Sequence, residues 1–533
     1  TFNADDTGTL ITAQTEQEGI KSLSVLSEMA LINLEGRGLL GKVGVDARIF
    51  RALGNSGVSV SIIAQGSSER GIGLVVESKQ AQQAIAALRF EFEADFQNQD
   101  VNRIEIIDEV AVISIIGQDL STFHKPYSEL IKNGIVPLLF NNTVTGRNVS
   151  VVVRKPQLNK AINVVHGEIF GIAKKINVAI FGQGLVGGTL INQILASAAT
   201  IQERKGISLN IFSIANSKKI GLDKNGVTED WKSHFDTHAV EGGVQEVIAF
   251  AKANHLANLI AIDNTASPEF ITNYIDLAKN GFDLVSSNKI ANTVGFDFYQ
   301  KLRRVLDENQ KRYLYETNVG AGLPLIDTIR LLHLSGDNIT RIKGVFSGSL
   351  SYLFNTFSIE DRSFSNVLQE AIDKGFTEPD PREDLGGNDV GRKLLILARE
   401  LDLHKELSDV NIENLIPDHL RDGSASDFLG SLKELDAVFE SRKKALKEDE
   451  VLRYVGDLYG DLSKEDGGTL EVKLVTVSKN SALGQVKGSD SIFEIYTESY
   501  GENPLVIQGA GAGAAVTARG VFGDILKLAE RNN

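Results

Sequence analysis

The chain has 533 residues, a formal net charge of −15 and no cysteine. The length suits roughly three or four domains, the acidic balance argues against a nucleic-acid partner, and the absence of thiols excludes disulfides, cysteine-ligated metals and a cysteine nucleophile. No apolar run approaches the roughly 20 residues that cross a bilayer, and the first residues lack the basic and apolar parts of a secretory signal. A cytoplasmic enzyme is therefore expected.

The first 175 residues contain a duplicated unit. In each copy the apolar patterns predict a strand, a helix, two strands and a helix. A fixed repeat of this kind marks duplicated α+β units, which serve either as scaffolding or as a pair of ligand-binding modules. The matching segments are NSGVSV (55–60) with KNGIVP (132–137), VESKQAQQAI (76–85) with VRKPQLNKAI (153–162), and ALINLEG (30–36) with AVISIIG (111–117).

This pattern resembles the ACT domain, a small βαββαβ fold that senses amino acids. The bend at residues 38–50 resembles the ACT loop before the first helix, and IAQGSSERGIGLVV (63–76) is similar to the ACT repeat of aspartate kinases. The second copy has NNTVTGRNVSVVV in place of the QGSSER segment. The resemblance implies ACT units at 20–104 and 105–175. We hypothesise that a pathway end product, threonine, binds the first unit, although the sequence leaves the effector open.

A different pattern begins at Ile176, where the apolar run INVAIF leads into G-x-G-x-x-G and then into an amphipathic segment. The glycines of such a motif allow a tight turn, close approach of a pyrophosphate and close helix–strand packing, and the helix N-terminus attracts the phosphates. The motif alone is a weak signal, but the strand–turn–helix context favours a dinucleotide site over a simple glycine turn. The predicted cofactor-binding residues here are Gly182, Gln183, Gly184, Leu185, Val186 and Gly187.

The next predicted strand, SLNIFSIAN (208–216), indicates the type of cofactor. NAD sites usually place an acid at its end to hold the ribose 2′-hydroxyl. This chain has Asn216, Ser217, Lys218 and Lys219 there, and hydroxyl and ammonium groups suit a 2′-phosphate. We therefore favour NADP bound by Ser217 and Lys218. NAD, and an ordinary exposed turn, stay open.

Two further predicted strands, LIAIDNT (259–265) and DLVSSNK (283–289), flank a helix. Ligands of doubly wound sheets lie at the carboxyl ends of the strands. Thr265 and Lys289 are therefore expected on the ligand side of the sheet.

The stretch EPDPREDLGGNDVGRK (378–393) holds five carboxylates and ends on Lys393. It suits a solvated acidic loop, a metal site or part of an active site; the absence of histidine makes a divalent metal the weakest of these. Asn388 is predicted to cap a helix that places Asp389 and Lys393 on one face. On an arbitrary helix this pair would be a surface ion pair of about 0.3–0.5 kcal/mol.

From Ile176 onward the chain resembles homoserine dehydrogenase. The resemblance rests on FGQGLVGG, AIDNTAS, SSNKIANT, YETNVGAGLPLIDTI, FSGSLSYLFN, FTEPDPREDLGGNDVGRKLLILARE, LRYVG and IQGAGAGAAVTARGVFGDIL, which occur in family order. With the ACT pair, the chain resembles the C-terminal two-thirds of bifunctional aspartate kinase–homoserine dehydrogenase. That family reduces aspartate 4-semialdehyde to homoserine with NAD(P)H, within threonine and methionine biosynthesis.

The resemblance also implies roles for individual residues. Lys393 falls on the family's proton donor, and Lys289 on the lysine of its N-K-x-A motif, with Asp389 as a third catalytic residue. Substrate binding is implied for Glu378, Asp384 and Asp389; cofactor binding for Gly182 to Gly187, Thr265, Lys289 and Gly513; and a monovalent cation, held largely by backbone carbonyls, for Glu316, Val319, Ala321 and Leu323.

The residue types fit this chemistry. Hydride delivery to an aldehyde leaves charge on oxygen, which the ammonium of Lys393 stabilises and protonates. The substrate is an amino acid, so its α-ammonium needs carboxylates such as Glu378 and Asp384. Asp380 and Glu383 are interpreted as loop acids or partners of Arg382. Val390, Leu394 and Leu397 are expected in the core.

The expected fold class is α/β and α+β: tandem ACT units, a Rossmann domain and an α+β catalytic and dimerisation domain. A homodimer or homotetramer is expected, without kinase activity, because the family's kinase domain has no counterpart here. An aspartate-semialdehyde dehydrogenase is excluded by the absence of cysteine; a non-catalytic amino-acid sensor with a decayed dehydrogenase half is the alternative. The expected segments are a linker strand at 1–19, a Rossmann domain at 176–315, a catalytic domain at 316–505, and at 506–533 a glycine turn and helix returning to the Rossmann domain.

Overall fold

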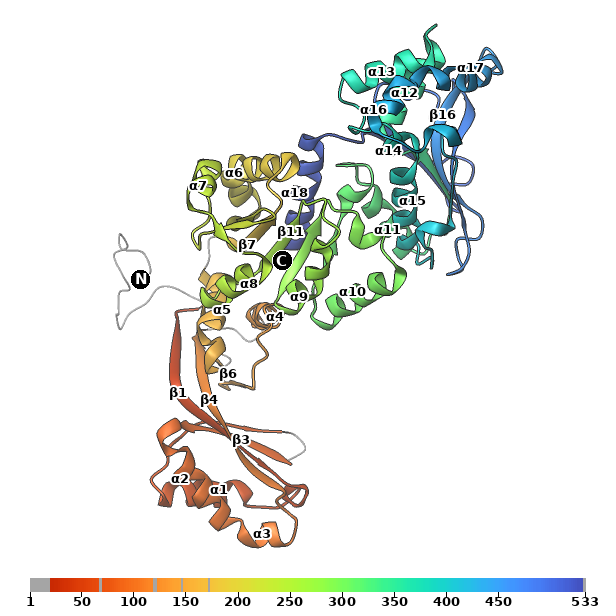
Figure 1. Ribbon diagram of the computed structural model, residues 1–533. Helices are drawn as coiled ribbons and strands as arrows, with labels where there is room; N and C mark the ends of the chain where they lie inside the picture. Colours follow the sequence, from red (N-terminus) through yellow and green to blue (C-terminus); the bar gives the residue numbers. More distant parts are fainter. Residues whose placement is uncertain (1–19, 67–69, 118–121, 145–146, 171–172, 531–533) are drawn as a thin grey trace. The chain divides into compact units, whose positions relative to one another are not determined.

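The computed structural model describes residues 20–66, 70–117, 122–144, 147–170 and 173–530 (Figure 1). The chain divides into two compact units: residues 1–175 with 255–257, and residues 176–254 with 258–533. The linker strand expected at 1–19, and Ser67 to Glu69 of the QGSSER segment, lie outside the described residues.

The first unit is one antiparallel sheet in the order β2-β3-β1-β4-β6-β5. The two copies of the repeat meet through their long first strands, which pair from Ser22 with Ile116 to Glu35 with Arg103. The predicted order of strand, helix, two strands and helix is confirmed in both copies. Its elements are β1 (Ser22–Glu35), α1 (Val45–Asn55), β2 (Val60–Gln65), β3 (Gly71–Glu77), α2 (Ala81–Glu91), α3 (Glu93–Gln97), β4 (Arg103–Ile116), α4 (His124–Lys132), β5 (Leu139–Asn142), β6 (Asn148–Arg154) and α5 (Leu158–Phe170).

Strand alternation in β1 separates two cores. Ala30, Ile32 and Leu34 pack beneath α1 and α2 with other buried residues of the first copy. Met29 and Leu31 point to the opposite face, where they join buried valines from both copies. This second cluster holds the copies together across the β1–β4 seam.

The second unit begins with a seven-stranded sheet in the order β10-β9-β8-β7-β11-β12-β13. β7, β11, β12 and β13 pair in parallel, as expected for a Rossmann domain. After β8 the chain turns back into antiparallel β9. The elements are β7 (Lys174–Phe181), α6 (Leu185–Lys205), β8 (Ile207–Ala215), β9 (Lys219–Leu222), α7 (Trp231–His238), β10 (Val240–Glu241), α8 (Val244–Ala253), β11 (Leu259–Asp263), α9 (Tyr274–Lys279), β12 (Phe282–Ser286), α10 (Phe296–Glu308) and β13 (Tyr313–Leu314).

The same unit continues with a six-stranded sheet in the order β15-β17-β16-β14-β18-β19, on which α12 and α15 pack. All of its strand pairs are antiparallel except β15 with β17. The elements are α11 (Leu325–Leu334), β14 (Ile339–Val345), α12 (Gly348–Ile359), α13 (Phe364–Asp373), α14 (Arg382–Leu385), α15 (Asn388–Glu400), β15 (Val410–Ile412), α16 (Ala425–Gly430), α17 (Asp436–Lys444), β16 (Glu450–Tyr459), β17 (Thr469–Ser478), β18 (Asp490–Thr497), β19 (Leu505–Ala510) and α18 (Ala514–Glu530).

The last helix, α18, leaves the six-stranded sheet and packs on α6 of the domain with the seven-stranded sheet (Figure 1). Its buried residues Val521, Phe522 and Ile525 share one apolar core with Ile180 of β7 and Leu190 of α6. The two domains of the second unit are therefore joined by packing as well as by the chain.

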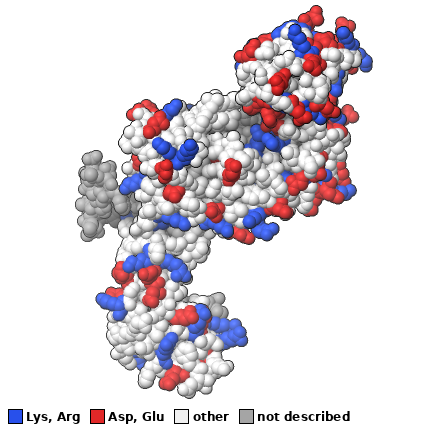
Figure 2. Space-filling view, in the orientation of Figure 1, with Lys and Arg blue, Asp and Glu red and all other residues white. Residues whose placement is uncertain are grey.

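None of the described helices is long and apolar enough to cross a membrane. On the face shown in Figure 2, acidic and basic side chains are interspersed over both units.

Candidate functional site

The glycine turn after β7 shows a different steric reason for each glycine. Gly182 has a φ of 90°, and a Cβ there would lie 2.8 Å from the carbonyl carbon of Asn264. A Cβ on Gly187 would lie 1.8 Å from the Gly182 carbonyl oxygen. The helix can therefore lie this close to the strand only because residue 187 is glycine. A Cβ on Gly184, the residue that caps α6, would meet no atom within 4 Å. The space that Gly184 leaves open, at the N-terminus of a 21-residue helix, fits a pyrophosphate.

The turn between β8 and β9 carries the predicted NADP residues. Asn216, Ser217, Lys218 and Lys219 are all exposed there. The side-chain oxygen of Asn216 accepts hydrogen bonds from the backbone N–H groups of Lys218 (2.9 Å) and Lys219 (2.8 Å), which shapes the turn. Ser217 and Lys218 are thus available to a ligand lying at the end of β8.

At the ends of β11 and β12, buried polar groups form a hydrogen-bonded cluster around Asp263. The carboxylate of Asp263, 2% exposed, accepts hydrogen bonds from the Tyr274 hydroxyl (2.7 Å), the Asn288 amide (3.1 Å) and the Thr265 backbone N–H (2.8 Å). Burial raises the pKa of the Asp263 carboxyl, and these hydrogen bonds oppose that rise. Thr265 and Lys289 follow just beyond the carboxyl ends of β11 (Leu259–Asp263) and β12 (Phe282–Ser286), where they were expected.

An unsatisfied group lies beside the glycine turn. The side-chain amide nitrogen of Asn264 is buried and donates no hydrogen bond within the described residues. Asn264 also contacts the position at which Gly182 turns. An orphaned donor and an open cradle at one end of the sheet fit a bound dinucleotide.

Lys289, Asp389 and Lys393 form one cluster across the two domains. The Asp389 carboxylate lies 2.8 Å from the Lys393 ammonium and 3.1 Å from that of Lys289. Removal from bulk water raises the pKa of Asp389, but the two ammonium groups outweigh that effect and hold the pKa well below its usual range. One carboxylate thus faces two ammonium groups, and the cluster keeps one net positive charge.

The acids ahead of α15 occupy distinct positions. Asp384, on α14, accepts hydrogen bonds from the Ser349 hydroxyl (2.6 Å) and from the Glu378 backbone N–H (2.8 Å). Burial raises the pKa of the Asp384 carboxyl, the two hydrogen bonds lower it, and the nearby charges of Glu378 and Asp389 raise it further. Glu378 itself is exposed. These mutually repelling acids favour a cationic ligand.

Two contributors were missed by the sequence reasoning. The Phe346 carbonyl oxygen accepts a hydrogen bond from the Lys393 ammonium (2.9 Å), and Ser349 holds Asp384. Both belong to FSGSLSYLFNTF (346–357), a stretch that mixes small polar residues with aromatics and overlaps one of the motifs of the family resemblance. The start of α12 thus supports both the lysine and the acid.

One prediction for this stretch was wrong. Asn388 does not cap α15 but is its first residue; the cap is Gly387, with a φ of 75°. A Cβ on Gly387 would lie 2.1 Å from the Tyr454 hydroxyl oxygen, so close packing against β16 requires glycine here. The shared face of Asp389 and Lys393 is confirmed.

Other expectations for the stretch are confirmed. Asp380 pairs with Arg382 at 2.6 Å, and Glu383 is exposed. Val390, Leu394 and Leu397 are 1% exposed or less.

The loop expected to hold a monovalent cation has an irregular backbone and carbonyl oxygens that accept no hydrogen bond within the described residues. Gly320 and Ala321 both have positive φ, 82° and 52°. Within the described chain, the carbonyl oxygens of Val319 and Ala321 accept no hydrogen bond, whereas the Leu323 carbonyl accepts one from the Leu325 N–H (2.9 Å). The Glu316 side chain accepts hydrogen bonds from two N–H groups that open α11, and burial raises its pKa to about 8.

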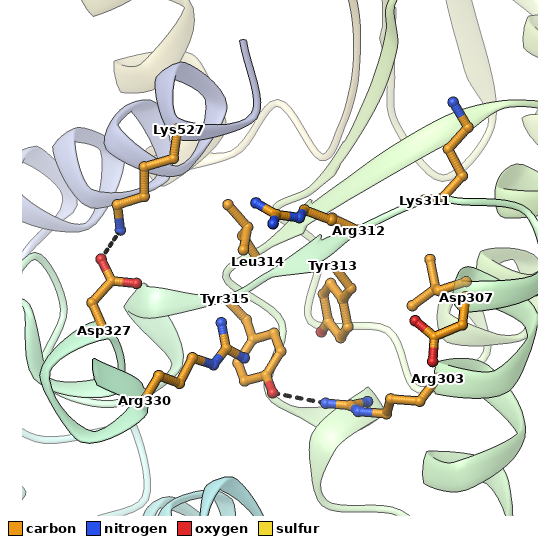
Figure 3. A pocket seen from close by; sticks show the side chains of 11 residues that line it. Arg303, Asp307, Lys311, Arg312, Tyr313, Leu314, Tyr315, Asp327, Arg330 and Lys527 are labelled. Carbon is orange, nitrogen blue, oxygen red and sulfur yellow. Dashed lines mark hydrogen bonds and ion pairs between the residues drawn. The ribbon is translucent and has the colours of Figure 1, made fainter. Parts of the chain in front are cut away.

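A cavity of about 400 Å³ lies beside β13, and its lining does not include Lys289, Asp389 or Lys393 (Figure 3). It is rich in cations, but the structure pairs them: Arg330 with Glu400, Lys527 with Asp327, and Arg303 with the Tyr315 hydroxyl. We interpret it as a joint between α10, β13, α11 and α18. Its lining is Arg303, Leu306, Asp307, Lys311, Arg312, Tyr313, Leu314, Tyr315, Asp327, Arg330 and Lys527.

The glycine turn before α18 completes the surroundings. Gly513 has a φ of 116°, and a Cβ there would touch only Val516, at 3.8 Å. The Gln193 side chain of α6 donates to the Ala515 carbonyl (3.0 Å) and ties this turn to the helix that follows the first glycine turn. Gly513 is thus kept beside the dinucleotide-binding domain.

The fold and this arrangement define a dinucleotide-binding protein with a second, ligand-binding domain and an ACT-type pair. Comparisons with known proteins agree. A model described as homoserine dehydrogenase matches residues 324–526, its NAD binding domain matches 182–316, and an ACT domain model matches 32–92. The chain therefore belongs to the homoserine dehydrogenase family and also carries an ACT domain.

Two curated relatives match almost the whole of this chain. A bifunctional aspartokinase/homoserine dehydrogenase from Haemophilus influenzae is 36% identical over 536 residues, covering 99% of this chain and 65% of its own length. A chloroplastic enzyme of the same name from Arabidopsis thaliana is also 36% identical and covers 99% of this chain and 59% of its own length. This chain thus spans less than two thirds of these relatives.

Solved structures support the fold of the second unit. A Candida auris protein of unknown function has a TM-score of 0.60 and 34% identity, covering 67% of this chain and 99% of its own. A hyperthermophilic archaeal homoserine dehydrogenase in complex with NADPH has a TM-score of 0.51 and 24% identity, covering 67% and 98%. The second likeness concerns the fold alone.

Proposed function

We propose that this chain catalyses the reversible NAD(P)H-dependent reduction of L-aspartate 4-semialdehyde to L-homoserine. The observation that carries the proposal is the Lys289–Asp389–Lys393 cluster, which joins the carboxyl end of β12 to the helix after the acidic loop. Its net positive charge suits a developing alkoxide, and the neighbouring acids suit an α-ammonium. An NADPH-dependent assay with aspartate semialdehyde tests it; a folded chain without turnover would favour the non-catalytic sensor.

The cofactor, when bound, supplies hydride to the aldehyde carbon. Lys393 then protonates the oxygen, directly or through a water molecule, and the Phe346 carbonyl aims its ammonium. Asp389 holds Lys393 and Lys289 together against their mutual repulsion. Glu378 and Asp384 bind the α-ammonium of the substrate, which orients its aldehyde toward the lysines.

We propose NADP as the preferred cofactor. The support is the exposed turn with Ser217 and Lys218 after β8, which has no acid to hold a 2′-hydroxyl. Gly182 to Gly187, Thr265, Lys289 and Gly513 form the remainder of the proposed site. Equal dissociation constants for NADPH and NADH would contradict this preference.

The proposed role of Asp384 predicts a pH dependence. Its pKa in the folded chain lies above the usual carboxyl value of about 3.9. Binding of an ammonium needs the ionised form, so the KM for homoserine should rise as pH falls through that raised pKa. Asp384→Asn should raise the KM about 10–100-fold at neutral pH and abolish this acid limb.

The matched control for Asp384→Asn is Glu383→Gln, an exposed acid of the same stretch.

The raised pKa of Asp384 also predicts an effect on the stability of the fold. A carboxyl whose pKa is raised by folding stabilises the fold below its unfolded pKa and loses that contribution as pH rises. Asp384→Asn should therefore keep or raise the melting temperature at pH 7. A lower melting temperature, or an equal KM change in the control, would speak against the role.

We also propose a monovalent cation in the loop of Glu316, Val319, Ala321 and Leu323. The support is the pair of unengaged carbonyls at Val319 and Ala321, which hard cations prefer as ligands. Replacing sodium and potassium salts by choline chloride should lower thermal stability. Unchanged stability and activity would remove this proposal.

Threonine is proposed as the effector of the first ACT unit. The loop before α1 is fixed by Lys42, whose ammonium binds Asp95 (2.9 Å) and Asp100 (2.7 Å), while Leu40 and Val43 stay exposed. Such a loop can contact the ACT unit of a second copy of the chain. We therefore also propose a homodimer or homotetramer, and we propose that the protein is cytoplasmic. Titration calorimetry should detect threonine binding. A binding heat with lysine or methionine, and none with threonine, would make that amino acid the effector instead.

A further inference from the structure

Helix α15 is attached at both ends to the loop that carries Lys289. At its N-terminal end, Asp389 contacts Lys289 at 3.1 Å. At its C-terminal end, Arg399 donates to the carbonyl oxygens of Asn292 (2.9 Å) and Val294 (2.8 Å). The short helical turn from Ile290 to Asn292 follows directly on Lys289, so the second attachment lies next to the first.

Arg399 is built into this joint. Its residue is 2% exposed, and the guanidinium also donates to the Lys405 carbonyl (2.9 and 3.1 Å) and to the Glu406 carboxylate (3.1 Å). The other oxygen of Glu406 accepts from the Phe296 N–H (2.7 Å), at the start of α10. A guanidinium has a rigid fork of donors, which a lysine cannot reproduce.

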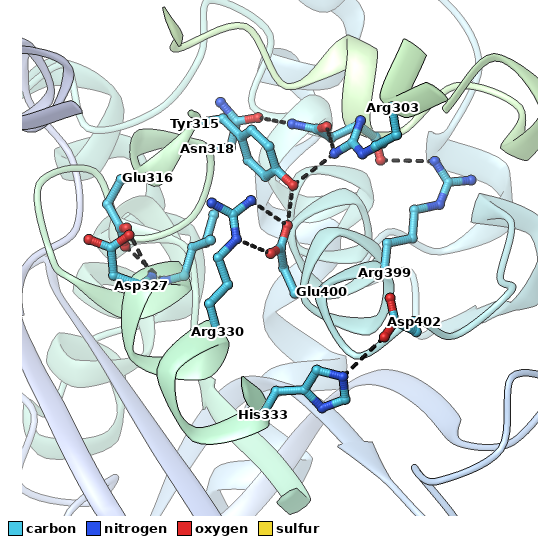
Figure 4. A network of polar contacts seen from close by, with 12 residues as sticks. Arg303, Tyr315, Glu316, Asn318, Asp327, Arg330, His333, Arg399, Glu400 and Asp402 are labelled. Atoms are coloured by element: carbon cyan, nitrogen blue, oxygen red, sulfur yellow. Dashed lines mark hydrogen bonds and ion pairs between the residues drawn. The ribbon is translucent and has the colours of Figure 1, made fainter. Parts of the chain in front are cut away.

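The loop side of the joint is equally fixed (Figure 4). The Asn292 side chain donates to Asn318 (2.8 Å), which in turn donates to the carbonyl of Ser286 at the end of β12. Figure 4 shows Asn318, Arg303 and Arg399, whose side chains lie around this joint. Arg303 donates to the Asn292 side-chain oxygen (2.9 Å). Asn292 therefore binds Arg399 through its backbone carbonyl, and binds Asn318 and Arg303 through its side chain.

We propose that Arg399 is a positioning residue that sets the distance between Lys289 and the Asp389–Lys393 pair. This inference rests on the proposed function. Lys289 stands on a short turn, and its side chain is 33% exposed, so neighbouring packing alone does not hold it. Loss of the Arg399 fork frees the carbonyls of the turn, and a displacement of about 1 Å at a reacting group costs up to about 100-fold in rate.

The test compares Arg399→Lys, Lys289→Ala and the double variant in the full-length chain. Arg399→Lys should lower kcat about 10-fold relative to wild type. In the Lys289→Ala background, Arg399→Lys should lower kcat by no more than about 2-fold, because the residue that it positions is gone. Full multiplication of the two effects, or wild-type kcat in Arg399→Lys, would overturn the proposal.

An isotope effect separates positioning from general damage. With 4-deuterated NADPH, a misplaced Lys289 should make the chemical step limiting and raise the isotope effect on kcat. A partly unfolded preparation keeps the wild-type isotope effect, because its remaining active molecules are normal, and that outcome contradicts the proposal. The control is Arg392→Lys, an exposed arginine on the same helix, which should match wild type.

Glu406→Gln provides a second variant if Arg399→Lys does not fold. It weakens the bond to Arg399 from a half-exposed position and should lower kcat in the same direction, again without additivity with Lys289→Ala. An unchanged kcat in Glu406→Gln would then count against the inference. Failure of the proposed function is distinct, because wild type itself would then show no turnover.

Discussion

Replacement of Lys393 by alanine should lower kcat about 100- to 10,000-fold, since one side chain supplies both a proton and charge stabilisation. The Lys393 side chain is 12% exposed, and its ammonium is held by Asp389 at 2.8 Å and by the Phe346 carbonyl at 2.9 Å. NADPH binding should persist, because the glycine turn is untouched. Steady-state kinetics and a fluorescence titration with NADPH measure the two effects.

Two controls accompany Lys393→Ala. Lys433→Ala removes an exposed lysine and should match wild type. Lys393→Arg keeps the positive charge but donates a proton poorly, because the pKa of a guanidinium lies above about 12. A low kcat in Lys393→Arg therefore supports proton donation, whereas activity near wild type would leave only charge stabilisation. Wild-type turnover by Lys393→Ala would refute the assignment.

Alanine at Gly187 should damage both stability and cofactor binding. The added methyl would lie 1.8 Å from the Gly182 carbonyl oxygen, so either the helix or the turn must move. We expect a loss of about 1–3 kcal/mol, the usual effect of overpacking, and a loss of NADPH affinity. Thermal melting and NADPH titration measure the two losses.

The neighbouring glycines provide matched controls. In Gly188→Ala the nearest atoms lie at 3.6 and 3.7 Å, so the variant should be neutral or gain up to about 1 kcal/mol of helix stability. Gly184→Ala should melt like wild type yet bind NADPH more weakly, because its methyl enters the space kept for the pyrophosphate. Normal NADPH binding by Gly184→Ala would show that the cofactor lies elsewhere.

Local patterns were sufficient to predict much of this fold. The repeat in the first unit was readable because β1 and β4 each place alternate apolar residues on opposite faces. The first glycine turn was readable because its strand and helix follow at once in the chain. The pairing of β1 with β4 could not be predicted, because two strands that begin 81 residues apart in the chain leave no local signal of their contact.

The candidate site shows the same division. The pair of Asp389 and Lys393 follows from helical spacing alone. The contribution of Phe346 is a backbone carbonyl, to which any residue type contributes equally, so no sequence pattern could assign it. The cap at Gly387 was missed because its reason is the Tyr454 hydroxyl, which comes from a strand more than 60 residues later in the chain.

The return of α18 to the dinucleotide-binding domain has a consequence for synthesis. β7 and α6 emerge early from the ribosome, yet their core lacks Val521, Phe522 and Ile525 until the whole six-stranded sheet has been translated. A nascent dinucleotide-binding domain therefore exposes apolar surface for the time needed to add more than 300 residues. At about 5–20 residues per second this interval is roughly 15–60 seconds, and we expect the nascent chain to depend on chaperones during it.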